Sequence, residues 1–127
     1  MATTNKTGLP SEDQEQAWFV AWFRKTYPQY RIFAIPNGGG RSKAQGMLLK
    51  ATGVVSGVPD LMIAAPSGQY HGLFIEMKVQ KGGRVSPEQK DWIDYLTSVG
   101  YCARVCNGFE EARCCVEEYM SEMHGLL

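Results

Sequence analysis

Long apolar runs are missing from this chain of 127 residues. The longest uninterrupted apolar stretch runs only from Ala17 to Phe23, whereas a helix that crosses a bilayer needs roughly 20 such residues. The N-terminal residues carry neither the basic nor the hydrophobic stretch of a signal peptide. The sequence therefore predicts a cytoplasmic protein that has no membrane partner.

Cysteine is missing from most of the chain, because all four cysteines lie between Cys102 and Cys115. A secreted fold held by disulfides would spread its bridges along the chain, whereas clustered thiols suit a reducing compartment. A zinc site is the alternative, and its candidate ligands are Cys102, Cys106, Cys114 and His124. The C-x-x-C spacing of such sites is absent, so we expect buried free thiols.

Net charge is absent as well, since 13 basic side chains balance 13 acidic ones, and overall charge points to no polyanionic partner. Acidic residues are, however, missing from the whole segment between Arg24 and Pro59. The basic residues of this segment are Arg24, Lys25, Arg31, Arg41, Lys43 and Lys50. A glutamate-rich stretch from Glu110 to Glu122 compensates for them. The basic segment is either an ordinary solvated surface or a surface that holds a polyanion through phosphate contacts.

The chain is long enough for one compact domain and leaves little room for two. Residues 1–10 are polar and show no periodicity. We therefore expect a flexible N-terminus, followed by a single domain over residues 11–127. No internal repeat or low-complexity linker divides that domain.

Apolar periodicity, capping residues and turn residues predict an alternation of helices and strands. The expected helices cover approximately residues 11–26, 42–53, 86–99 and 109–123, and the expected strands cover residues 30–35, 60–65, 73–79 and 101–106. The second and third strands should pair as an antiparallel hairpin. The order α-β-α-β-β-α-β-α predicts an α/β fold in which helices flank a mixed central sheet.

The strand expected over residues 73–79 carries an acid and a base two positions apart. The period of two places Glu76 and Lys78 on one face of the sheet, about 7 Å apart. Unpaired buried charges are costly. Either this pair faces solvent on an edge strand, or the two side chains bind something.

Asp60 follows Pro59 at the start of the partner strand, where the hairpin could bring its carboxylate beside Glu76. Two adjacent carboxylates repel, and Mg²⁺ or Mn²⁺ relieves that repulsion by binding carboxylate and carbonyl oxygens. Lys78 beside such an ion could contact a phosphate and help to orient or deprotonate a water. The arrangement predicts a hydrolytic site, and the basic segment upstream suggests a phosphate substrate.

Pro59-Asp60 and Glu76-Met77-Lys78 together form the pattern Pro-Asp followed by Glu-x-Lys. This pattern alone is weak evidence for a family, but it lies in a specific sequence context. That context is Ile35-Pro36-Asn37-Gly38-Gly39, Arg41, Leu49-Lys50, Gly53, Gly57-Val58-Pro59-Asp60-Leu61, Gly72-Leu73-Phe74-Ile75-Glu76-Met77-Lys78, Ser86-Pro87-Glu88-Gln89 and Trp92. Over roughly residues 12–120 the chain resembles the VRR-NUC (virus-type replication-repair nuclease) domain of the PD-(D/E)XK superfamily, especially its small stand-alone phage form. The resemblance implies a restriction-endonuclease-like core and metal-dependent hydrolysis of phosphodiester bonds.

The resemblance also implies roles for individual residues. The implied ligands of Mg²⁺ or Mn²⁺ are Asp60, Glu76 and the backbone carbonyl of Met77. Lys78 would assist the attacking water. Gln89 matches a family glutamine that steadies the catalytic lysine or the phosphate, and no nucleotide cofactor is expected.

Family members carry a further glutamate on the first helix, a few residues before a glutamine. Glu12 with Gln16 fits this pattern, and Glu15 is the competing assignment. Glu12 shares a helical stripe with Phe19 and Phe23, which places it at the rim of the core and favours it as a further ligand and catalytic residue.

DNA-binding residues are expected on the loops and helix ends near this site. The candidates are Asn37, Gly38, Gly39, Arg41, Lys43, Lys50, Lys81 and Arg84. The glycine-rich loop with Arg41 could meet a phosphate or could merely form a turn. The lysines are either DNA contacts or solvated charges.

The first functional hypothesis is a Mg²⁺- or Mn²⁺-dependent deoxyribonuclease that is selective for branched DNA such as four-way (Holliday) junctions. The resemblance implies this substrate, because stand-alone family members are similar to junction-resolving enzymes. The segment from Ala17 to Phe23 is apolar on nearly every side, which predicts a homodimer contact, and a two-fold dimer could address two strands of a junction. Duplex, nicked or flap DNA would suit the same residues. Such an enzyme would act in the cytoplasm, or in the host cytoplasm if a phage encodes it.

The alternative is a non-catalytic DNA-binding module of a phage replication or recombination complex. Such a module would keep the basic segment without needing the whole set of Asp60, Glu76 and Lys78, all of which are present. A third hypothesis, a small metal-binding structural subunit, rests on the cysteines.

Overall fold

The computed structural model describes residues 8–37 and 42–122. The elements are α1 (Glu12–Thr26), β1 (Ile32–Ala34), α2 (Lys43–Ala51), β2 (Leu61–Ile63), β3 (Leu73–Lys78), α3 (Pro87–Ser98), β4 (Cys102–Asn107) and α4 (Phe109–Ser121). This order confirms the predicted alternation. Most of the segment expected to be a flexible N-terminus lies outside the described residues. Among the residues described, no helix is both long and apolar enough to cross a membrane.

The four strands form one mixed sheet in the order β1-β2-β3-β4. Strand β2 pairs antiparallel with β1 and with β3, whereas β4 pairs parallel with β3. Leu61 lies opposite Ile75, which confirms the predicted hairpin. Strands β1 and β2 are shorter than predicted, because only three residues of each pair in the sheet. The fold is the predicted α/β class.

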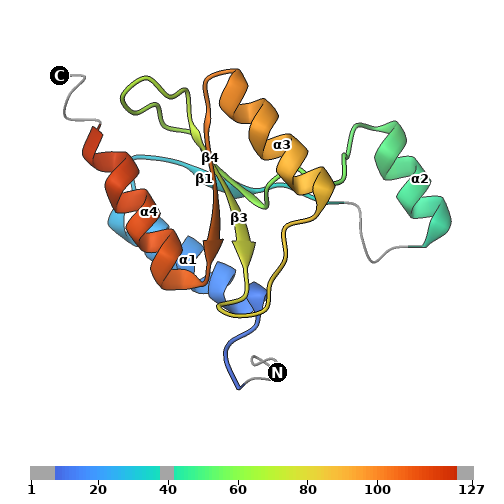
Figure 1. Ribbon diagram of the computed structural model, residues 1–127, viewed down its shortest axis with the longest axis horizontal. Helices are drawn as coiled ribbons and strands as arrows, with labels where there is room; N and C mark the ends of the chain where they lie inside the picture. Colours follow the sequence, from blue (N-terminus) through green and yellow to red (C-terminus); the bar gives the residue numbers. More distant parts are fainter. Residues whose placement is uncertain (1–7, 38–41, 123–127) are drawn as a thin grey trace.

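Helices cover both faces of the sheet (Figure 1). Helices α1 and α4 pack together on one face, where Phe19 and Val116 join the core with Ile75 and Met77 of β3. Helix α3 lies on the other face, next to β4. Because β3 is a central strand, its alternate side chains meet these two layers in turn.

Helix α2 differs from the other helices, because it stands apart from the sheet in Figure 1. It packs against none of the other helices and strands among the described residues, and none of its own residues is buried. Along the chain, α2 lies between β1 and β2.

Serine caps explain where three helices begin. The hydroxyls of Ser11, Ser42 and Ser86 each accept a hydrogen bond from the backbone N–H three residues later. At Ser86 the capping box, a reciprocal pair of such hydrogen bonds, is complete. The backbone N–H of Ser86 donates a hydrogen bond to Oε1 of Gln89 at 2.9 Å. This second bond fixes the Gln89 side chain at the start of α3.

The cysteines are all free thiols. Cys102 and Cys106 are buried as expected, whereas Cys114 is exposed on α4, so the expectation of burial was wrong there. His124 of the alternative zinc site lies outside the described residues, and those described contain no group of three or more His, Cys, Asp and Glu side chains that could hold a metal ion.

Candidate active site

Asp60 and Glu76 lie beside one another at one end of the β2–β3 hairpin. Asp60 directly precedes β2, and the antiparallel register places this end of β2 next to the second half of β3. The backbone N–H of Met77 donates to Oδ2 of Asp60 at 2.8 Å. This bond fixes the Asp60 carboxylate against the strand that carries Glu76.

Glu76 is a buried carboxyl group, with 2% of its surface exposed. Its Oε2 atom accepts a hydrogen bond from Nε2 of Gln89 at 3.1 Å, whereas Oε1 is buried and has no partner among the described residues. The pKa of Glu76 is raised to about 8, first by burial and then by the neighbouring Asp60 carboxyl and the charge of Glu12. The metal-free site therefore holds a proton on Glu76 at neutral pH.

Lys78 is the only cation whose charge is paired with this cluster within the described part of the chain, and it opposes the rise in the Glu76 pKa. Its Nζ atom lies 3.5 Å from Oε2 of Glu76, and its side chain is 12% exposed. Strand β3 is flanked by β2 and β4. The alternative of a solvent-facing pair on an edge strand is therefore wrong.

Glu12 lies near the same cluster, at the N-terminal end of α1. Partial burial raises the pKa of Glu12, the charge of Asp60 adds to the rise, and the charge of Lys78 opposes it. These interactions bring Glu12, Asp60 and Lys78 into one electrostatic group.

Glu15 has a different set of neighbours. Its Oε1 atom accepts hydrogen bonds from the backbone N–H of Phe109 at 2.9 Å and from Nε2 of Gln80 at 3.2 Å. It thus connects α1 to the start of α4, where Gly108 has a φ of +94° and an added Cβ would lie 3.1 Å from the Glu15 carboxylate. The buried residues of α1 are Glu15, Phe19 and Phe23, so Phe19 and Phe23 of the predicted stripe are buried as expected, while Glu12 is partly buried at the end of that stripe.

A cavity of about 250 Å³ opens beside the acidic pair. The residues that line it are Asn37, Ser56, Gly57, Val58, Asp60, Glu76, Ser86 and Gln89. Gly57 has a φ of +95°, and an added Cβ there would lie 2.8 Å from the backbone of Glu88. The chain that follows α2 can therefore pack this closely on α3 only because residue 57 is glycine.

The structure places the DNA-binding candidates on two sides of this region. Asn37 lines the cavity. Lys43 and Lys50 are exposed on α2, and Lys81 and Arg84 are exposed in the connection between β3 and α3. The remaining candidates, Gly38, Gly39 and Arg41, lie outside the described residues.

The donor atoms suit a hard divalent cation. Two carboxyl groups lie side by side, and Oε1 of Glu76 is buried without a partner in the described part of the chain, so a divalent ion would replace the Glu76 proton and relieve the repulsion. The absence of a three-acid cluster among the described residues means that Glu12 is not preassembled as a third ligand. Asp60, Glu76 and the Met77 carbonyl, completed by waters, have the composition that Mg²⁺ and Mn²⁺ favour.

Sequence reasoning missed two contributions to this region. It did not include Ser56 and Gly57 in the cavity, although the Gly-Val-Pro-Asp stretch was a usable signal for a tight approach. It also gave no indication that Glu15 contacts Phe109, because 94 residues separate the two positions.

Comparisons with known proteins identify the family of the chain. The family model of the VRR-NUC domain matches residues 3–110. A solved structure described as a "VRR_NUC domain protein" is similar to this chain, with a TM-score of 0.75 and 29% sequence identity over 88% of this chain and 89% of the other. No curated protein sequence matches the chain. The chain therefore belongs to the VRR-NUC family and has its nuclease-type fold.

Proposed function

We propose that this protein is an endonuclease that hydrolyses DNA phosphodiester bonds with the aid of Mg²⁺ or Mn²⁺. The observation that carries the proposal is the state of Glu76, a buried carboxyl beside Asp60 and Lys78 whose Oε1 atom lacks a partner. A buried carboxyl that lies among other carboxyl groups is costly to the fold unless it binds something. The family membership makes a nuclease the natural use of it.

Each residue has a role in this proposal. Asp60, Glu76 and the Met77 carbonyl would hold the ion, which when bound would act as a Lewis acid at the scissile phosphate. Gln89 keeps Oε2 of Glu76 in place. Lys78 would donate from Nζ to a phosphate oxygen or orient the attacking water, and Glu12 would hold a proton near Lys78.

Charge favours an approach of DNA from the side of α2. Lys43 and Lys50 are exposed on α2, and Lys81 and Arg84 are exposed on the neighbouring connection. Helix α4, which carries much of the acidic charge of the chain, lies at the opposite end of the molecule (Figure 1). Like charge there would repel phosphates, so a polyanion is guided towards the cavity.

We further infer a homodimer that acts on branched DNA. Trp18 on α1 is 46% exposed, and Met47 and Leu48 on α2 are 64% and 65% exposed. These apolar side chains suit a contact between two copies, and a two-fold dimer would present two sites to two strands of a four-way junction. Light scattering at several protein concentrations should give the mass of a dimer; a constant mass of 14.1 kDa would contradict this inference.

The proposed function is tested with end-labelled four-way junction, flap and duplex DNA in Mg²⁺, in Mn²⁺ and in chelator. We expect cleavage in at least one metal, fastest on the junction, and none in chelator. Lys78→Ala should abolish cleavage and retain binding, whereas the control Lys90→Ala, at an exposed lysine of α3, should cleave normally. Binding of DNA without cleavage in either metal would instead support the non-catalytic module.

A further inference from the structure

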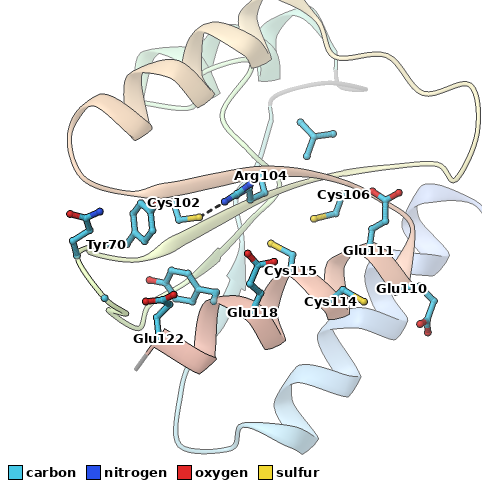
Figure 2. A pocket seen from close by; sticks show the side chains of 14 residues that line it. Tyr70, Cys102, Arg104, Cys106, Glu110, Glu111, Cys114, Cys115, Glu118 and Glu122 are labelled. Carbon is cyan, nitrogen blue, oxygen red and sulfur yellow. Dashed lines mark hydrogen bonds between the residues drawn. The ribbon is translucent and has the colours of Figure 1, made fainter. Parts of the chain in front are cut away.

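A second cavity, larger than the one beside Asp60 and Glu76, lies away from the proposed nuclease site. Its volume is about 610 Å³, and it lies between β4 and α4. Cys102, Cys106, Cys114 and Cys115 all line it, together with Arg104 (Figure 2). Glu76 contacts Gln89 of α3 on the other side of the sheet, so the two sites are separate.

Two of these thiols face one another across the packed elements. The sulfur of Cys115 points from α4 towards β4, and the sulfur of Cys106 points from β4 back towards it (Figure 2). Cys106 belongs to the buried core cluster, and Cys115 packs against that cluster. Cys106 is 2% exposed and Cys115 is partly exposed at the cavity, so Cys115 is the thiol that a small reagent reaches first.

Arg104 supplies positive charge to the same cavity. Its Nε atom donates to Sγ of Cys102 at 3.5 Å. The neighbouring Cys106 thiol lowers the pKa of the Cys115 thiol, and the charge of Arg104 contributes to the lowering, while burial and Glu118 oppose it. The thiolate is the reactive form of cysteine, so these contacts favour reaction at Cys115.

We propose that Cys115 is a peroxide-reactive thiol and that Cys106 converts its oxidised form into a Cys106–Cys115 disulfide. The Cys115 sulfur attacks a hydroperoxide, the O–O bond breaks, and the leaving oxygen takes up the proton that Cys115 lost, which gives a sulfenic acid and an alcohol or water. The Cys106 sulfur then attacks the sulfenic sulfur, and hydroxide leaves with the Cys106 proton as water. Two thiols are oxidised by two electrons, and one peroxide is reduced.

Cys114 is the matched control for this proposal. It precedes Cys115 directly and is more exposed, but its side chain points away from Cys106 (Figure 2). If exposure alone governed oxidation, Cys114 would react first. If the pairing with Cys106 governs it, Cys115 reacts first.

The test treats the full chain with hydrogen peroxide and maps its tryptic peptides without reduction. Cleavage after Arg104 and Arg113 separates the peptide of Cys106 from the peptide that carries both Cys114 and Cys115. We expect the two peptides to become linked in the wild type and in Cys114→Ser, and to stay separate in Cys115→Ser. Linkage that is lost in Cys114→Ser, or no linkage in the wild type, would overturn the proposal.

A second measurement does not depend on the folding of Cys115→Ser. In Cys106→Ser the sulfenic acid cannot be resolved, so dimedone should label Cys115 in peroxide on the order of tenfold faster than Cys114. Fragmentation spectra distinguish the two positions. Equal labelling, or preferential labelling of Cys114, would contradict the assignment of Cys115.

Discussion

Glu15 and Glu76 are buried to the same extent, each with 2% of its surface exposed, and each has one carboxylate oxygen without a partner in the described part of the chain. Their neighbours differ. Glu15 accepts hydrogen bonds from the Phe109 N–H, at the start of α4, and from Gln80. Glu76 lies among carboxyl groups that raise its pKa to about 8. Burial therefore does not separate a structural carboxylate from a functional one, whereas the charges around it do.

The two environments have opposite consequences for folding. N–H donors stabilise the Glu15 carboxylate, and the positive end of the α4 dipole adds to this effect. Burial and neighbouring negative charge destabilise the Glu76 carboxylate. A substitution of Glu15 should therefore lower stability more than activity, whereas a substitution of Glu76 should lower activity more than stability.

The largest effect is expected for Glu76→Gln. Loss of the charge would remove a metal ligand, so cleavage of the preferred DNA should fall on the order of 10³-fold or more. The amide fits the same space, so the thermal unfolding midpoint should not fall. Cleavage at the wild-type rate by this variant would remove Glu76 from the site.

Glu12→Gln should reduce cleavage less, by about a hundredfold, because Glu12 is near the cluster without being preassembled as a ligand. Its stability should match that of the wild type. Asp13→Asn, at the exposed neighbouring acid, is the control and should retain full activity. Loss of activity in Glu15→Gln, with Glu12→Gln unaffected, would reverse the assignment.

Glu15→Ala should affect stability and leave the chemistry of the folded protein intact. The Phe109 N–H and the Gln80 amide would lose their acceptor, at a cost of about 2 kcal/mol in the free energy of unfolding. Denaturant titration measures this change, with Asp13→Ala as the exposed control. An unchanged free energy of unfolding would show that Glu15 does not support the α1–α4 contact.

The smallest effect is expected in the pH dependence of stability without metal. The pKa of Glu76 is raised in the folded protein, so the protonated form stabilises the fold at low pH, and this contribution is lost as the pH rises from the usual carboxyl range through about 8. The unfolding midpoint of the wild type should therefore fall relative to that of Glu76→Gln between pH 5 and pH 8. Parallel curves for the two proteins would show that the Glu76 pKa is not raised.

Local signals in the sequence predicted much of the fold. The caps at Ser11, Ser42 and Ser86 depend on residues three positions away, and the alternation of β3 depends on the two-residue period. Long-range packing was not predictable in the same way. The sequence near Glu15 does not indicate its contact with Phe109. The sequence of residues 43–51 does not indicate that α2 stands apart from the sheet. The α1 stripe through Phe19 and Phe23 was predicted, but the full burial of Glu15 was not, because it depends on the contact with the start of α4.

Calorimetric titration of the metal-free protein with Mn²⁺ at pH 7, in buffers of different ionisation enthalpy, tests the central claim that Asp60 and Glu76 form one divalent-metal site. Because Glu76 is protonated there, binding should release close to one proton per ion. Asp60→Asn should weaken binding strongly, and Glu76→Gln should remove the proton release. Absence of Mn²⁺ binding, or identical binding and proton release in all three proteins, would contradict the account.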